Sequence, residues 1–125
     1  MSVPPPLAEL ETEVMDEMWR LRRATVRELM DAVNAGSRKP RAYTTYMTIM
    51  VRLETKGLLE RERQSKTDTY WPRLDREAYL EQRAQAEVQQ LVAEYGDHAL
   101  VHFARAMQTL DPARMRALRR LASRE

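Results

Sequence analysis

The chain has 125 residues, of which 43% are hydrophobic, and it contains no cysteine. A chain of this length forms one domain or two small ones, and its hydrophobic fraction is typical of a protein that folds on a core. The absence of cysteine excludes disulfides, thiolate metal sites and cysteine nucleophiles. With only six prolines and three glycines, the composition favours helices over a turn-rich all-β fold.

The N-terminal residues are not expected to form a targeting or membrane-spanning segment. Residues 1–6 have neither a long apolar run nor a basic flank, both of which a secretory signal peptide requires. No stretch approaches the roughly eighteen consecutive apolar residues of a transmembrane helix. We therefore expect a cytoplasmic protein.

The net charge is only +2, but the charges are unevenly distributed. Residues 1–37 contain four Lys and Arg against seven Asp and Glu, residues 38–66 contain eight against three, and residues 67–125 contain nine against nine. The positive charge is therefore concentrated in residues 38–66. A concentrated basic patch is typical of a nucleic-acid contact, although crowded basic loops also occur on inert surfaces.

Two helices are predicted before this basic segment. Apolar residues three or four positions apart, from Leu7 to Leu21, predict an amphipathic helix. Residues Thr25–Glu28 have the pattern of a capping box, which begins a second helix that Asn34–Gly36 ends. Pro40 prevents that helix from continuing.

A third helix is predicted over residues 44–56. Its apolar residues Tyr46, Ile49, Met50 and Leu53 have helical spacing, and Gly57 can end the helix in a left-handed conformation. The opposite face carries hydroxyl and basic side chains, namely Thr45, Thr48, Arg52 and Lys56. Two helices joined by a turn, the second with such a face, are typical of a helix-turn-helix.

A β-hairpin is predicted after the third helix. Residues 58–63 and 69–71 form its strands around the polar residues 64–68, and Tyr70 and Trp71 would pack the returning strand against the helices. A short connector is expected at residues 22–24. The longer turn and the hairpin fit a winged helix-turn-helix domain over residues 1–74.

Three further helices are predicted over residues 75–125. Asp75 caps a long helix that ends at Tyr95, Asp97 begins the next, and Asp111 followed by Pro112 begins the last. So small a domain buries too little apolar surface to be stable alone. We therefore interpret it as a dimerisation domain, so the expected fold is mainly α with a small β-hairpin wing. Its expected interface residues are Leu80, Val88, Leu91, Tyr95, Leu100, Phe103, Met107 and Leu118.

The residues expected to bind DNA lie on the third helix, before it and on the hairpin. We expect Thr44 or Thr45 to cap the helix, and Thr45 and Thr48 to face base edges or phosphates. Arg41 and Arg52 are better suited to phosphates; the alternative is a solvated or Glu-paired arginine. For the hairpin cations, DNA contact and a solvated surface are equally well supported. These cations are Arg61, Arg63 and Lys66.

Other kinds of site are less well supported. Tyr43 and Tyr46 could stack on single-stranded bases, but Tyr46 belongs to the apolar face. His98 and His102 have a spacing that can hold a metal, but no third ligand accompanies them, so a solvated or satisfied pair is favoured. No nucleophile or glycine-rich loop accompanies the paired carboxylates of the first helix. We expect no enzymatic activity, no metal and no cofactor.

Several short motifs occur together in one order. They are Leu10, Glu13-Val14-Met15, Trp19, Thr25-Val26-Arg27-Glu28, Ala42-Tyr43-Thr44-Thr45, Arg52-Leu53, Lys56-Gly57-Leu58 and Tyr70-Trp71-Pro72. With these motifs, the chain resembles the BlaI/MecI/CopY family of bacterial repressors, the penicillinase repressors, over residues 7 to about 80. The remainder matches in the number and length of its helices.

The resemblance implies a homodimer that binds palindromic operators and represses the genes downstream, often genes of β-lactamase or related antibiotic resistance. In penicillinase repressors a membrane sensor protease relieves repression by cutting the dimerisation domain, so a sensor protease is an implied partner. The best-known members are cut at an Asn-Phe bond, whereas the nearest counterpart here is His102-Phe103. The copper-responsive members use paired cysteines, which this chain lacks.

The primary hypothesis is therefore a dimeric DNA-binding transcriptional repressor. The alternative is a winged-helix protein-interaction module that does not bind DNA. Such a module would be expected to expose an apolar or acidic face on the third helix, whereas a basic, hydroxyl-bearing face is predicted here.

Overall fold

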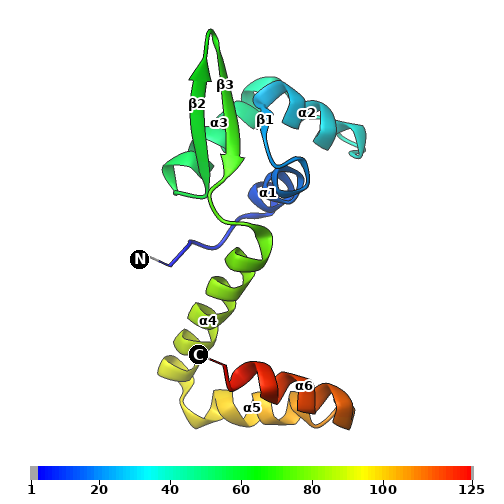
Figure 1. The fold of residues 1–125 in the computed structure, drawn as a ribbon, viewed down its shortest axis with the longest axis vertical. Helices are drawn as coiled ribbons and strands as arrows, with labels where there is room; N and C mark the ends of the chain where they lie inside the picture. The colour runs from blue at the N-terminus through cyan, green and yellow to red at the C-terminus, as the bar shows by residue number, and fades with distance from the viewer. Residues whose placement is uncertain (1–2, 125) are drawn as a thin grey trace. The chain divides into compact units, whose positions relative to one another are not determined.

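The computed structural model describes residues 3–124, and this range is mainly helical with a small antiparallel sheet, which confirms the predicted fold class (Figure 1). Contacts divide the chain into a first unit that ends at Ala84 and a second unit that begins at Gln85. This division lies inside helix α4 (Arg76–Tyr95), whereas the sequence placed the domain boundary at residues 74 and 75. In residues 3–124, no helix is long and apolar enough to cross a lipid bilayer.

The first unit begins with two helices, α1 (Glu9–Leu21) and α2 (Val26–Ala35). The predicted capping box of α2 is confirmed. The Thr25 hydroxyl accepts from the Glu28 amide at 3.2 Å, and the Glu28 carboxylate accepts from the Thr25 amide at 2.8 Å. Two otherwise unpaired amides of the first turn are thereby satisfied, which fixes where α2 begins.

Helix α3 (Tyr43–Thr55) ends as predicted at Gly57, which has a φ of 81°. The Leu58 amide donates to the Leu53 carbonyl at 2.9 Å, and the Gly57 amide donates to the Glu54 carbonyl at 3.0 Å. This pair of bonds satisfies the last carbonyls of the helix and requires a left-handed residue at Gly57. Leu53 and Leu58 are both buried beside this turn.

The start of α3 differs from the expected one. Ala42 is the N-cap and no side chain caps the helix, so the expected caps at Thr44 or Thr45 are wrong. The Asn34 side chain orders the entry instead, because it accepts from the Arg41 amide at 3.1 Å and donates to the Arg41 carbonyl at 3.0 Å. The Tyr46 hydroxyl also donates to the Asn34 oxygen, at 2.7 Å. One amide side chain from α2 therefore positions the beginning of α3.

The sheet contains β1 (Ala24–Thr25), β2 (Leu59–Gln64) and β3 (Thr67–Pro72) in the order β1-β3-β2. The hairpin is confirmed, but its loop is shorter than predicted, because Gln64 pairs with Thr67 and only two residues connect the strands. Ser65 has a φ of 59° in this tight turn. Strand β1, which pairs Ala24 with Tyr70, replaces part of the expected connector.

The core of the first unit combines all three helices with the sheet. Side chains that are at most 2% exposed come from each of these elements: Val14, Met15, Met18, Ala24, Leu29, Tyr46, Met50, Leu53, Leu58, Leu59 and Tyr70. Trp19 lies at the edge of this core, where its indole nitrogen donates to the Leu74 carbonyl at 2.9 Å. Tyr79 of α4 is also buried and its ring lies 5.4 Å from that of Trp19. The first turns of α4 therefore pack on the first unit.

The second unit contains the end of α4, helix α5 (Asp97–Met107) and helix α6 (Pro112–Ala122). The predicted caps are confirmed: the Asp75 carboxylate accepts from the Ala78 amide at 2.7 Å, and the Asp111 carboxylate accepts from the Arg114 amide at 2.8 Å. Gly96 separates α4 from α5 with a φ of 60°. Among residues 85–124, no side chain is buried.

Candidate nucleic-acid interface

The threonines predicted on the outward face of α3 differ in their exposure to solvent. Thr44 and Thr48 are exposed, whereas Thr45 is half-buried at the flank of the helix. The Thr48 hydroxyl donates to the Thr44 carbonyl at 2.9 Å, so its oxygen can only accept from a further partner. Thr44 and Thr48 are therefore the threonines that this face offers to a ligand.

The cations around α3 have different partners. The Arg52 side chain is exposed and forms no hydrogen bond or ion pair with the described residues. Arg41 lies 3.4 Å from the Glu13 carboxylate of α1, and both side chains are exposed. Solvent weakens such a pair, so Arg41 can exchange its partner for a phosphate at little cost. Both arginines remain accessible to an anion.

Lys56 does not belong to the outward face, where the sequence placed it. Its ammonium group donates to both oxygens of Glu11, at 2.9 and 2.8 Å, and Glu11 is buried in α1. Burial alone raises the pKa of the Glu11 carboxyl. The hydrogen bonds from Lys56 and the Ala8 amide, with the charges of Lys56 and Arg52, outweigh burial and lower that pKa. Lys56 thus joins the end of α3 to α1.

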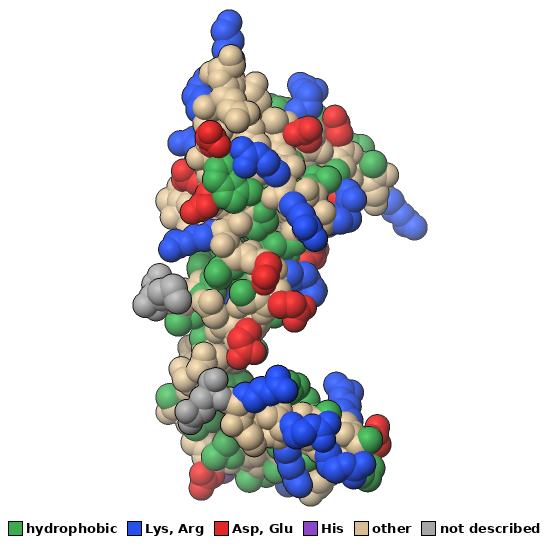
Figure 2. Space-filling view, in the orientation of Figure 1, with side chains coloured by type: hydrophobic (Ala, Val, Ile, Leu, Met, Phe, Trp, Pro, Cys, Tyr) green, Lys and Arg blue, Asp and Glu red, His purple; other side chains and the backbone are tan. Residues whose placement is uncertain are grey.

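The hairpin places its cations beside an acidic residue. Arg61 lies 3.7 Å and Arg63 lies 3.5 Å from the Asp68 carboxylate, and Arg61 also lies 3.8 Å from Glu54. Lys66 is exposed near the turn and its side chain has no partner among residues 3–124. Figure 2 shows a Lys or Arg side chain at the tip of the hairpin. The hairpin therefore has one unpaired cation and two that Asp68 holds.

A groove of about 490 Å³ lies between α2, α3 and the hairpin. Its wall includes Arg27, Tyr43 and Met47 together with the hairpin cations Arg63 and Lys66. The Arg27 guanidinium lies 5.5 Å from the centre of the Tyr43 ring. Neither Arg27 nor Met47 was predicted from the sequence as a site residue. Met47 could have been found, because it falls outside the helical spacing of the buried residues of α3.

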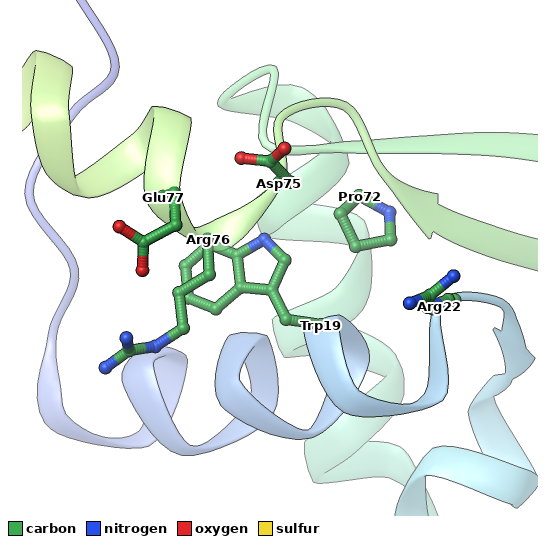
Figure 3. Close-up of a pocket in the computed structure, with 6 residues that line it drawn as sticks. All are labelled: Trp19, Arg22, Pro72, Asp75, Arg76 and Glu77. Atoms are coloured by element: carbon green, nitrogen blue, oxygen red, sulfur yellow. The ribbon is translucent and has the colours of Figure 1, made fainter.

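The hollow beside Trp19 has a volume of about 560 Å³, and Figure 3 shows the side chains that line it. Three of its polar groups already have structural roles. Asp75 caps α4, the Trp19 nitrogen donates to the Leu74 carbonyl, and Arg76 lies 3.8 Å from Asp16. The described residues contain no group of three side chains that could hold a metal ion.

The residues predicted for dimerisation are accessible in the single chain. Seven of them are exposed and Phe103 is half-buried; the exposed ones are Leu80, Val88, Leu91, Tyr95, Leu100, Met107 and Leu118. An apolar groove of about 360 Å³ in the second unit is lined by Leu91, Tyr95 and Phe103 together with both histidines. Leu80 belongs to the first unit.

Part of the chain is similar in sequence to known proteins. Transcriptional regulator BlaI of two Mycobacterium tuberculosis strains, CDC 1551 / Oshkosh and H37Rv, is 40% identical over 67 residues. That match covers 53% of this chain and 47% of the regulator, so the chain spans about half the length of these curated relatives.

Two solved structures resemble the chain as well. The DNA-binding domain of the repressor BlaI matches with a TM-score of 0.54 and 25% identity, over 63% of this chain and 94% of that one. Bacillus licheniformis BlaI, solved as a monomer in complex with the blaP half-operator, matches with a TM-score of 0.51 at the same identity and coverage.

The sequence profile of one family extends over nearly the whole chain. Residues 7–124 match the penicillinase repressor family, whose members are transcriptional regulators and not enzymes. This match includes the winged helix, the exposed face of α3 and the three C-terminal helices. The chain therefore belongs to the penicillinase repressor family.

Proposed function

We propose that this protein is a dimeric transcriptional repressor that binds a palindromic operator through α3 and the hairpin. The observation that carries the proposal is the outward face of α3, where exposed threonines lie beside cations that the fold leaves accessible. Family membership supports a repressor, and the Bacillus licheniformis BlaI structure, which is a complex with a half-operator, supports DNA as the ligand.

The proposed roles follow from exposure and partners. Thr44 and Thr48 face base edges, while the half-buried Thr45 lies at the flank, where a phosphate is the nearer ligand. Arg41 and Arg52 bind phosphates, and Lys66 binds the DNA backbone from the tip of the hairpin. Arg61 and Arg63 can join them by exchanging Asp68 for a phosphate.

The second domain supplies the dimer in this proposal. Residues 75–124 expose an apolar surface, and no side chain of residues 85–124 is buried in the single chain. A second copy would cover that surface, and two-fold symmetry would match the two halves of a palindrome. A sensor protease that acts on this domain is the implied partner for induction, and the cytoplasm is the expected location.

A gel-shift experiment on the DNA upstream of the protein's own gene tests the proposal. We expect a retarded complex whose affinity falls steeply with salt, because bound phosphates release counterions. Arg52→Ala should weaken binding to all sequences, whereas Thr48→Ala should change which operator is preferred. Arg20→Ala is the matched control, since Arg20 is an exposed arginine paired with Glu17 on the acidic helix α1.

The protein-interaction module remains the second candidate, and the same experiment separates the two. A module that does not bind DNA would give no complex at low salt with either operator or random DNA. An equal loss on specific and random DNA for Thr48→Ala would instead argue against base reading by Thr48 while leaving DNA binding intact.

A further inference from the structure

Helix α3 carries an exposed apolar row that the fold does not use. Tyr43, Met47 and Val51 are 39%, 46% and 38% exposed, respectively. They are four residues apart, so they lie along one side of the helix. The core uses a different set of α3 residues, from Tyr46 to Leu53. Single exposed apolar residues are ordinary. An aligned row of them beside Thr44 and Thr48 instead indicates a ligand with apolar groups.

The surroundings of this row identify the ligand class. Arg27 lies over the Tyr43 ring, and Arg63 and Lys66 line the same groove. Arg52 is exposed directly after Val51. An apolar protein partner would have to remove these cations from water, which is costly. Duplex DNA neutralises them instead and offers apolar groups in its major groove.

The hydrogen-bonding groups of α3 restrict how it can read bases. The helix contains no Asn, Gln or Lys, so the common bidentate readers of adenine and one common reader of guanine are absent. Thr48 can only accept, because its hydroxyl already donates to the Thr44 carbonyl. Few donors therefore remain for base edges. The thymine 5-methyl group is the apolar feature of the major groove that such a surface can still recognise.

We propose that α3 recognises its operator through thymine methyl groups, with Met47 and Val51 as the specificity-determining contacts. This inference rests on the proposed DNA-binding function and adds the chemical group of the DNA that the site recognises. Tyr43, held by Arg27, positions the N-terminal end of the row beside the groove. Thr44 and Thr48 contribute hydroxyl oxygens on the adjacent side.

The experiment compares thymine with deoxyuridine, which differs only by the missing methyl group. The full chain first selects its preferred duplex from a random library, and each thymine of that duplex is then replaced in turn. In each half-site, we expect the replacement of at least one thymine to weaken binding about fourfold. This is the loss in affinity expected when one buried methyl group is removed. Met47→Ala or Val51→Ala should remove the discrimination at its own position.

Val3→Ala is the matched control, because Val3 is 57% exposed and lies outside α3. It should retain the full difference between thymine and deoxyuridine. Met47→Ala and Val51→Ala should unfold at the same temperature as the parent chain, because both side chains are exposed. This measurement separates a lost contact from a lost fold.

Two contrary results have different meanings. If the chain selects and binds a duplex but no deoxyuridine replacement weakens binding, methyl reading is wrong and the proposed repressor stands. Retention of the discrimination by both alanine variants would overturn the assignment to Met47 and Val51. If no duplex is selected or bound at low salt, the proposed function fails and this inference fails with it.

Discussion

The two units of the chain obtain their structure in different ways. In the first unit, side chains from three helices and a sheet form a common core in which many are fully buried. In residues 85–124, no side chain is buried, and α5 and α6 are eleven residues each. Isolated helices this short are marginal in water. The first unit therefore has what it needs to fold alone, whereas residues 85–124 have local helix caps but no buried core of their own.

The largest effect on stability is expected from a substitution that creates a cavity in the core of the first unit. Leu53→Ala should lower the free energy of unfolding by about 2–5 kcal/mol, because Leu53 is fully buried and its removal leaves a void. Urea unfolding followed by tryptophan fluorescence measures this change. Leu121→Ala is the control, since Leu121 is 58% exposed and its loss should change the stability by no more than about 0.5 kcal/mol. Similar losses for both variants would contradict the contrast between the units.

The proposed dimer interface can be tested by introducing a charge on the apolar surface of the second unit. Leu91→Asp should weaken the proposed dimer by about 2 kcal/mol or more, roughly thirtyfold, because the carboxylate would be buried at an interface centre. Sedimentation at micromolar concentrations measures the dissociation. Gln90→Asp introduces the same charge at the neighbouring exposed position and should leave the dimer intact. A parent chain that sediments as a monomer would contradict the proposed dimer.

Removal of the ion pair between Glu11 and Lys56 should have a smaller effect on stability, and this effect should be confined to the first unit. Lys56→Met should cost about 1–3 kcal/mol at neutral pH, because it leaves a buried carboxylate without its partner. Lys39→Met is the control, since Lys39 is an exposed lysine in the turn before α3. Thermal unfolding monitored by circular dichroism measures both variants, and equal stability of Lys56→Met and the parent would contradict this role.

The same pair predicts a pH dependence. Because the pKa of Glu11 is lower in the folded chain than its ordinary value of 4.5, the unfolded chain binds more protons in this range. The contribution of Glu11 to stability is therefore complete above about pH 4.5 and is lost as the pH falls through the folded pKa. Urea unfolding at a series of pH values should show this loss in the parent chain and a reduced slope in Lys56→Met.

The smallest expected effects come from two similar helix caps, one in each unit. Thr25→Ala should lower the free energy of unfolding of the first unit by about 1 kcal/mol, because α2 belongs to the core. Asp111→Ala removes a comparable cap from α6. It should increase hydrogen exchange in α6 without changing the unfolding of the first unit. A loss of first-unit stability in Asp111→Ala would show that the units are energetically coupled.

The sequence predicted those features that depend on local spacing. The helices, the capping box at Thr25 and the left-handed Gly57 were all predicted, because each depends on residues within a few positions of one another. Strand β1 was missed, since two residues are too few to show a period. The bond between Lys56 and Glu11 joins residues 45 positions apart, which no local pattern reveals.

The candidate site was predicted unevenly for the same reason. Helical spacing correctly placed Thr48 and Arg52 on the exposed face of α3, but it also placed Lys56 there and overlooked Met47 and Val51. Apolar residues in a helix are ordinarily assigned to a core, although Met47 and Val51 both fall outside the helical spacing of the buried residues of α3. The assignment of DNA contacts to individual residues stays a prediction, as does the domain boundary at residues 74 and 75.

The separation of the two faces of α3 has a consequence for evolution. The side chains that hold the helix in place, such as Tyr46 and Leu53, are different from those that face outward, such as Met47 and Val51. After a gene duplication, the outward set can therefore vary while the scaffold keeps its stability. A few substitutions on one helix face would be enough to give two descendants separate target sites.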